Sequence, residues 1–559
     1  MTRPPRFFFR ARALLAVCFC GLTSAVLAQS LVRPPLEFLP DVDAEPEAVS
    51  SLLRAEQMQL AKMDSYPRGG PDAIAGVGDW WLSNGVLCAA ISDVEHDAGI
   101  VSGGGSLVDL GYCDRDDDQW SYANFLTGLS KDTAIPVQRI HAEIRDGGAE
   151  IVTLGQRDGL RQIVRYRLEE DSQTLNVQVE ISRYAEGPAL RLSGLFTLYS
   201  QRALSPFSYS SYAPEATLGF AQKQIDRHDT ASLINGLMPA DWNILVGSDA
   251  YEAGVSYGVQ LESAELITAS GTRRSLPTFL AVFPDYSMHG WMTRPLWMQS
   301  ERLNWLSMLQ NRFMDIDKKE RLLANFNVVV GKRSDVASVT DQIYRGPELR
   351  GYSSHQAVSF SVWDRHERAV TQVRPNADGS FRVRLPDRAQ RVRVSAVTPW
   401  GQRKARELSV VDSRNDSGRW VFTQNGELSL PRNVAMSLYF FGVDGTADPE
   451  FGDDLLAFSE GGIALRNEDQ GNRIDLAGVP SDPERISLPE GHYRVLVGRG
   501  IEYDIEEYLL TVVAGQRSEL PIRPPQRAWY SEDWRSADLH VHSGASFDSV
   551  LPLQERLRS

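Results

Sequence analysis

Short apolar or alternating runs, separated by Gly, Asn, Asp and Pro turns, repeat along the chain from Ile74 to about Val330. Examples are R-Y-R-L (165–168), L-N-V-Q-V-E-I (175–181) and F-N-V-V-V (326–330). Alternation with a period of two places successive side chains on opposite faces of a strand, and its repetition over roughly 250 residues is typical of a large β-sandwich. No G-x-G-x-x-G or P-loop motif and no βαβ rhythm is present in the sequence, which argues against a nucleotide-binding fold.

A compact β-unit is predicted for residues 357–412. It combines alternating runs with a turn at 376–379, and the alternation places Phe381, Val383 and Leu385 on one face of a strand. The segment resembles the carboxypeptidase-regulatory-like, transthyretin-type β-domains, in which a D-G-S-F turn leads into a strand that ends in L-P. The resemblance implies a small antiparallel sandwich, and such modules usually act as spacers.

A further β-unit is predicted from about Arg419 to Ile522, where I-S-L-P-E-G-H-Y-R-V-L-V (486–497) repeats the same order of strand, turn and strand. Outside these regions and the N-terminal segment, two helices are expected. The apolar residues between Ala48 and Met63 suit one amphipathic helix, and a short helix from Asp335 to Tyr344 would close the large domain. The chain is therefore predicted to be mainly β, a large β-sandwich followed by smaller immunoglobulin- or transthyretin-like β-sandwiches.

Residues 1–28 have the pattern of a secretory signal peptide. Four arginines precede an apolar core (13–26), and the small-residue cleavage site V-L-A ends before Gln29. The core is shorter than the ~20 apolar residues that a spanning helix needs. We therefore expect a periplasmic or extracellular protein with no membrane span after signal removal.

Charge and cysteine content follow from this export prediction. The chain has 58 basic and 73 acidic residues, a net charge of −15, and loss of the four signal arginines gives 54 − 73 = −19. Such an acidic chain is not expected to bind nucleic acid. The two cysteines that remain, Cys88 and Cys113, can form a disulfide in an oxidising compartment, but their spacing is equally compatible with two buried free thiols.

The most informative motif is D-L-H-V-H-S at 538–543. Residues i and i+2 of a strand share a face, so His540 and His542 would present two imidazoles side by side while Leu539 and Val541 turn into apolar packing. H-x-H alone is a weak signal for a metal site. Together with S-x-D-S-x-L-P-L-x-x-R at 546–556, however, it resembles the first metal motif of PHP-domain metallohydrolases of the CehA/McbA-like branch. The upstream run 488–516 resembles the β-domain that precedes the barrel in secreted members of that branch.

This resemblance implies that His540 and His542 bind a divalent metal, Zn²⁺ or Mn²⁺, at the start of a distorted β/α barrel whose later strands add His, Glu and Asp ligands. A metal-bound hydroxide then attacks a phosphate ester or, in some members, a carbamate or amide-like bond. The chain stops at Ser559, 559 − 542 = 17 residues after His542, whereas a barrel of this kind needs on the order of 200 residues. The expectation is therefore the accessory region of a secreted metal-dependent hydrolase, truncated at the barrel and inactive as given.

Two alternatives remain open at this point. One is a cell-surface or periplasmic β-module protein that binds glycans or proteins, and the other is activity assembled with a separately encoded barrel. The tryptophans could stack on sugars, but most aromatics in a β-sandwich are core residues; they are Trp80, Trp81, Trp291, Trp297 and Trp305. Asp114, Asp116 and Asp118 have a spacing that can offer oxygen ligands to Ca²⁺, although a solvated acidic turn is the favoured interpretation. The remaining histidines are scattered and are interpreted as structural or surface residues.

The resulting domain order has six segments. These are a signal peptide (1–28), a linker and helix (29–73), a large β-sandwich (74–346), a carboxypeptidase-regulatory-like β-domain (352–415), a β-domain preceding the barrel (419–526) and the start of the PHP domain (530–559).

Overall fold

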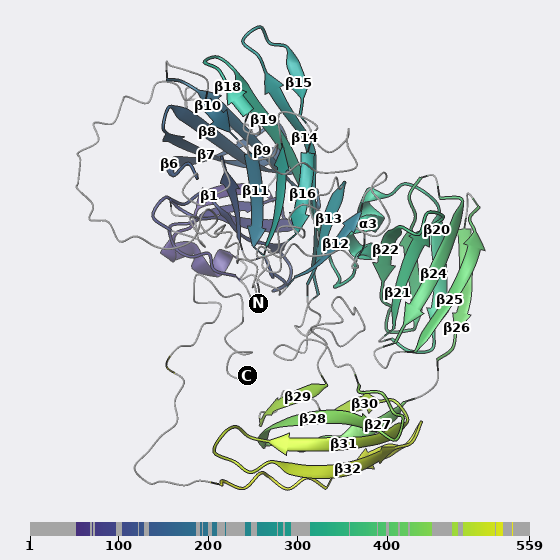
Figure 1. Cartoon of the computed structure of the whole chain (residues 1–559). Coiled ribbons are helices and arrows are strands. Elements are labelled where there is room, and N and C mark those ends of the chain that lie inside the picture. The colour runs from purple at the N-terminus through teal and green to yellow at the C-terminus, as the bar shows by residue number, and fades with distance from the viewer. Residues whose placement is uncertain are drawn as a thin grey trace, which may run out of the picture. The chain divides into compact units, whose positions relative to one another are not determined.

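The structure, a computed structural model, is mainly β in the part of the chain that it describes (Figure 1). That part comprises residues 52–66, 70, 73–96, 103–120, 122–127, 134–185, 190–192, 194–199, 204–209, 219, 241–247, 254–276, 278–282, 286–291, 314–356, 358–387, 389–398, 402–411, 414–422, 425–449, 472–478, 484–519, 521–528 and 539. The predicted fold class is therefore confirmed, while the predicted signal peptide lies outside these residues. Within them, no helix is both long and apolar enough to cross a membrane.

Two large sheets form the first domain. The eight-stranded sheet has the order β1 (Arg54–Gln57), β2 (Trp80–Ser83), β3 (Leu87–Ile91), β4 (Leu107–Tyr112), β5 (Tyr122–Leu126), β11 (Gly194–Tyr199), β17 (Tyr286–Trp291) and β16 (Thr278–Val282). The other large sheet has the order β12 (Ser205–Tyr209), β13 (Trp242–Val246), β14 (Ser256–Ile267), β19 (Arg321–Gly331), β9 (Thr174–Arg183), β8 (Leu160–Glu169), β7 (Gly148–Arg157) and β6 (Val137–Arg145), with β15 (Arg273–Ser275) paired to β14. We call this second sheet the nine-stranded sheet. A separate short pair is formed by β10 (Leu190–Leu192) and β18 (Met314–Ile316).

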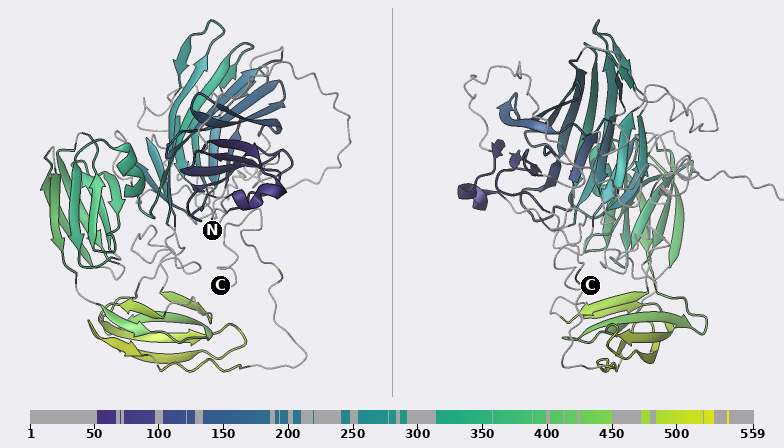
Figure 2. Two further views of the ribbon diagram at one scale, coloured as in Figure 1. Left: turned by 180° about the vertical axis from the view of Figure 1, so that it is seen from behind. Right: turned by 60° about the vertical axis from the view of Figure 1, so that its left-hand side comes forward.

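One large hydrophobic cluster contains residues of both large sheets and joins them. Phe196 of the eight-stranded sheet meets Phe326 of the nine-stranded sheet with ring centroids 4.9 Å apart. Strand β8 is buried at every second position, which is the period that sequence alternation predicts for a strand with one face in a core. Its other face, with that of its neighbours β7, β9 and β19, points away from the core. Figures 1 and 2 show β14, β19 and β9 as long neighbouring strands.

The helix predicted from Ala48 to Met63 is wrong for the described residues of that range. Arg54–Gln57 is strand β1, antiparallel to β2, and Leu60–Ser65 is a short 3-10 helix, η1. Leu53 and Met58 are both buried, in two different core clusters. Pairing with β2 outweighs the helical spacing of the apolar residues, because backbone hydrogen bonds and burial in the finished domain override local propensity. The large domain therefore begins before residue 74.

The second predicted helix is confirmed. Helix α3 (Ala337–Ile343) follows β19, and the Ser338 backbone N–H donates a 2.8 Å hydrogen bond to the Asp335 carboxylate. This bond satisfies one of the free N–H groups at the start of the helix. Asp335 is therefore the helix-start signal in the sequence.

The middle sandwich contains β20 to β26. One sheet has the order β23 (Ser380–Arg384), β20 (Glu348–Ser353) and β26 (Arg414–Trp420), and the other has β22 (Ala369–Val373), β21 (Ser359–Asp364), β24 (Arg391–Val397) and β25 (Arg403–Ser409). Phe381, Val383 and Leu385 are all buried, as predicted. The predicted boundaries 352–415 are too narrow, because the first strand starts at Glu348 and the last ends at Trp420.

The third sandwich repeats the topology of the middle one. Its sheets are β30 (Arg485–Leu488), β27 (Gly426–Ser429) and β33 (Arg517–Glu519), and β29 (Arg473–Ala477), β28 (Ala435–Val443), β31 (Gly491–Gly498) and β32 (Glu506–Val512). In both sandwiches the first strand lies between the fourth and the seventh, and the second lies between the third and the fifth. The first and last strands pair in parallel in both cases, so the middle sandwich is not wholly antiparallel, as the sequence had suggested for it, and neither is the third.

Candidate functional site

The predicted metal ligands, His540 and His542, lie outside the described residues, as does the predicted PHP segment apart from Leu539. Leu539 is 94% exposed. Among the residues that the structure describes, no group of three His, Cys, Asp or Glu side chains is placed to hold a metal ion. The metal site thus stays a prediction.

The acidic turn after Cys113 is a structural element. The carboxylate of Asp118 accepts hydrogen bonds from the backbone N–H groups of Leu110 and Trp120, at 2.9 and 3.1 Å. Asp114 is exposed, and its carboxylate lies 3.7 Å from the ammonium group of a lysine, Lys332. Because Asp118 is buried while Asp114 and Asp116 are exposed, the three carboxylates do not converge on one cation.

Cys88 and Cys113 form a disulfide that joins β3 to the residue following β4. Their Cα atoms are 5.1 Å apart, within the range that a disulfide requires. The alternative of two free thiols is therefore wrong.

The tryptophans do not form a sugar-stacking surface in the described part of the chain. Trp81 and Trp291 are buried in hydrophobic clusters, and Trp80 donates its indole N–H to the Asp93 carboxylate at 3.0 Å. Trp297 and Trp305 lie outside the described residues. Core packing, the favoured interpretation from sequence, is confirmed for Trp81 and Trp291.

His289, on β17, is one of the scattered histidines and is buried. Its Nε2 atom has no hydrogen-bond partner within the described part of the chain. Burial lowers the pKa of His289 to about 3 from 6.5, because the charged ring would lose its hydration. The folded chain therefore keeps this ring neutral at a pH where the unfolded chain binds a proton. Its contribution to stability is complete above pH 6.5 and is lost as the pH falls toward 3.

We expect His289→Leu to reduce the loss of stability of the large domain in acid. In the wild type, this histidine lowers the free energy of unfolding by about 1.4 kcal/mol for each pH unit below its unfolded pKa, or about 2 kcal/mol at about pH 5. Urea unfolding at neutral pH and at about pH 5 measures this difference. His366→Leu, which removes an exposed histidine of the middle sandwich, is the control for a substitution outside the large domain. An unchanged pH dependence in His289→Leu would contradict a neutral buried imidazole.

A polar groove of about 390 Å³ lies on the nine-stranded sheet. We call it the sheet groove. Its lining is Arg145, Asp146, Glu150, Arg165, Arg167, Asn176, Val177, Gln178, Glu262, Asn325, Phe326 and Asn327. These residues come from β6, the β6–β7 turn, β7, β8, β9, β19 and β14, so the sheet itself forms the floor of the groove.

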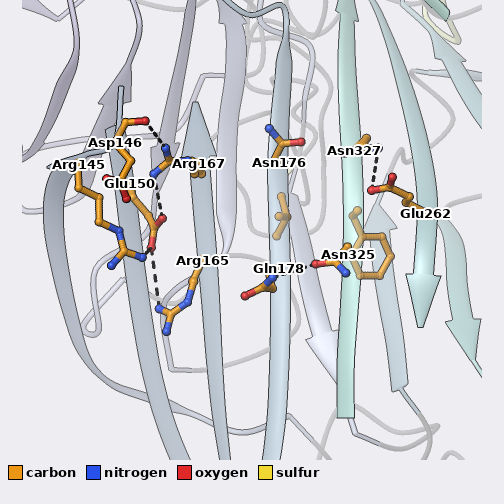
Figure 3. Close-up of a pocket in the computed structure, with 12 residues that line it drawn as sticks. Arg145, Asp146, Glu150, Arg165, Arg167, Asn176, Gln178, Glu262, Asn325 and Asn327 are labelled. Atoms are coloured by element: carbon orange, nitrogen blue, oxygen red, sulfur yellow. Dashed lines mark hydrogen bonds and ion pairs between the residues drawn. The ribbon is translucent and has the colours of Figure 1, made fainter. Parts of the chain in front are cut away.

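Strand register arranges most of the polar lining in two rows that cross the sheet. Successive Cα partners are Glu150, Arg167, Asn176 and Asn327 in one row, and Arg165, Gln178 and Asn325 in the other. Neighbouring strands lie about 4.8 Å apart, so the side chains within a row are immediate neighbours. Figure 3 shows them projecting from adjacent strands.

The buried carboxylate of Glu150 lies at the centre of the arginine end of the groove. Glu150 has a side chain only 3% exposed, and Arg145 and Arg167 approach it to 3.4 and 3.6 Å. Arg165 lies farther away, at 3.9 Å, and one third of its side chain is exposed. A buried charge is costly unless it is paired, so Glu150 draws the guanidinium groups toward it (Figure 3). Arg167 also donates to the carboxylate of Glu169 at 2.6 Å, which fixes it further. Among the described residues, Arg165 therefore keeps most of its donors available.

The amide end of the groove is a chain of hydrogen bonds. Gln178 donates to the Asn325 side-chain oxygen at 3.0 Å, and Asn325 donates to Ser263 at 2.9 Å. Asn327 donates to the Glu262 carboxylate at 3.4 Å. These bonds orient the amides and leave some of their donors and acceptors open to the groove.

The sheet groove was not predicted from the sequence. A signal was present, because R-Y-R, N-V-Q and N-F-N all place Arg or amide residues on the face opposite to a buried residue. Gln178 and Asn325 are 147 residues apart, however, and the alternation does not reveal which strands pair.

Comparison with known proteins identifies no family for this chain. No protein-family model and no curated protein matches it. Solved structures align weakly. They include the GH36 α-galactosidase AgaB from Geobacillus stearothermophilus (9% identity, 50% of this chain and 45% of that one, TM-score 0.29). A galactose mutarotase related enzyme from Lactobacillus acidophilus has 8% identity over 46% of this chain and 98% of its own (TM-score 0.25). A TPR-domain containing protein from Parabacteroides distasonis has 8% identity over 50% and 53% (TM-score 0.27). Alignments this weak assign no function to the chain.

Proposed function

We propose that the β-domains of this chain are the accessory region of a secreted metal-dependent hydrolase. The observation that carries the proposal is the order of segments. A large β-sandwich is followed by two small sandwiches of one topology, and these by the D-L-H-V-H run with His540 and His542. In this proposal the small sandwiches are spacers between the large domain and the metal-binding strand. The Cys88–Cys113 disulfide supports export, because such bonds persist mainly in oxidising compartments.

The proposed metal is Zn²⁺ or Mn²⁺, and the proposed substrate is a phosphate ester. Two imidazoles supply only part of a catalytic zinc site, which uses three protein ligands and an open position for water. The proposal therefore assigns the remaining ligands to the later strands of the β/α barrel that the resemblance implies. When bound, the metal would lower the pKa of its water and so supply the attacking hydroxide.

We expect the 559-residue chain to bind Zn²⁺ or Mn²⁺ weakly, with binding lost when His540 and His542 are both replaced by alanine. Two imidazoles are fewer protein ligands than a zinc site ordinarily uses, so the expected affinity is low. Calorimetric titration of the purified chain with each metal salt measures the affinity. His492→Ala, at an exposed histidine of the third sandwich, is the matched control and should bind as the wild type does.

Two results would count against the proposal. One is metal binding that is equal in the double variant and in His492→Ala, since the metal would then sit elsewhere. The other is metal-dependent cleavage of a phosphodiester that survives the loss of both His540 and His542.

A further inference from the structure

We propose that the sheet groove binds a neutral oligosaccharide. This inference goes beyond the hydrolase proposal and does not depend on it, because it involves neither His540, His542 nor a metal. It rests on the composition, the fixed geometry and the size of the groove on the nine-stranded sheet.

The charges that line the groove cancel. Three arginines face three carboxylates, and the other four polar lining residues are uncharged amides. Arginine only donates hydrogen bonds, a carboxylate only accepts them, and an amide does both. A ligand that satisfies all three must carry many donors and acceptors and no net charge. Sugar hydroxyl groups have this property, since each donates one hydrogen bond and accepts others.

The groove has few apolar groups to offer a ligand. The side chains of Val177 and Phe326 are each 1% exposed and belong to the core beneath the sheet. Recognition would therefore rest on hydrogen bonds, which favours a polyhydroxylated ligand over an apolar one. Because each neutral hydrogen bond exchanges with one to water, we expect modest affinity.

The polar groups are held in place before any ligand binds. At one end Glu150 pairs with Arg145 and Arg167, and Arg167 also donates to Glu169 at 2.6 Å; at the other end Gln178 donates to Asn325. Apart from Asp146 in the β6–β7 turn, the polar lining residues project from strands rather than from loops. Such preorganisation reduces the entropy lost on binding. The side chain of Asn176, between the two ends, is the most direct candidate contact because no hydrogen bond engages it within the described part of the chain (Figure 3).

The test measures the binding of defined oligosaccharides to the 559-residue protein by ligand-observed NMR and by calorimetry. The probes are linear neutral oligosaccharides of glucose, mannose, galactose and xylose, with oligogalacturonate as the acidic comparison. We expect at least one neutral oligosaccharide to bind, and the double replacement Asn176→Ala with Gln178→Ala to weaken its affinity by about tenfold or more. Gln138→Ala removes an exposed amide from β6 of the same sheet and should leave binding unchanged.

Unfolding curves establish that each variant is folded, and Arg165→Ala provides a second test of the groove if the double variant is unstable. Three outcomes would overturn the proposal. They are no binding of any neutral oligosaccharide, equal binding by wild type and groove variants, and binding of oligogalacturonate alone, which would make the groove an anion site. Failure here leaves the metal titration unaffected, so the two proposals are tested separately.

Discussion

Replacing Phe360 by alanine should lower the free energy of unfolding of the middle sandwich by about 3 to 5 kcal/mol, the cost of truncating a fully buried aromatic ring. Phe360 has no exposed surface, and its ring stacks on Phe381 with centroids 4.2 Å apart. It also meets Trp420 edge-on at 5.4 Å. The cavity would thus open between the two sheets of the sandwich and deprive the neighbouring rings of their contacts.

Denaturant unfolding of the full chain, followed by tryptophan fluorescence and circular dichroism, measures this loss. Because the chain has several domains, each unfolding transition must be assigned to one of them. Phe440→Ala, at a fully buried ring on the second strand of the third sandwich, should shift a different transition. Val421→Ala, next to Trp420 and 55% exposed, is the control. It should change the free energy of unfolding of neither sandwich by more than about 0.5 kcal/mol. A Phe360→Ala effect below about 1 kcal/mol would contradict the packing described here.

Removal of the Cys88–Cys113 disulfide should destabilise the large domain by about 3 to 4 kcal/mol. The bond closes a loop with a sequence separation of 25 residues, and in the chain-entropy account its loss frees that loop in the unfolded state. The double variant Cys88→Ala with Cys113→Ala is compared with the wild type by urea unfolding.

A reductant distinguishes the lost bond from the lost side chains. Dithiothreitol should destabilise the wild-type protein by a similar amount and leave the double variant unchanged. Destabilisation of the double variant without any response of the wild type to reductant would show that the effect comes from packing around Cys88, which is 8% exposed.

Local alternation predicted the strands of this protein well. The run that places Phe381, Val383 and Leu385 on one face lies in the core, because a period of two needs no partner to be recognised. The helix predicted between Ala48 and Met63 was wrong for the opposite reason. The structure of this segment depends on the pairing of Arg54–Gln57 with β2, and no local sequence pattern reveals that contact.

The two candidate sites also differ in whether a local sequence pattern reveals them. His540 and His542 are only two positions apart in the sequence, so a short motif was enough to propose a metal site. The sheet groove combines the consecutive strands β6 to β9 with β14 and β19, which come much later in the sequence, and its rows exist only once β8, β9 and β19 are in register. Sequence could identify polar strand faces but not that they form one surface.

The parallel pairing of the first and last strands has a mechanical consequence for each small sandwich. In the middle one, β20 and β26 run side by side in the same direction, from Glu348 beside Arg414 to Ser353 beside Trp420. The chain therefore enters at one end of this sheet and leaves at the other, about 20 Å away for a strand of this length. Tension between these two points pulls the paired strands past each other. Their hydrogen bonds would then bear the load together, in shear, rather than opening one after another as in a hairpin pulled from its ends.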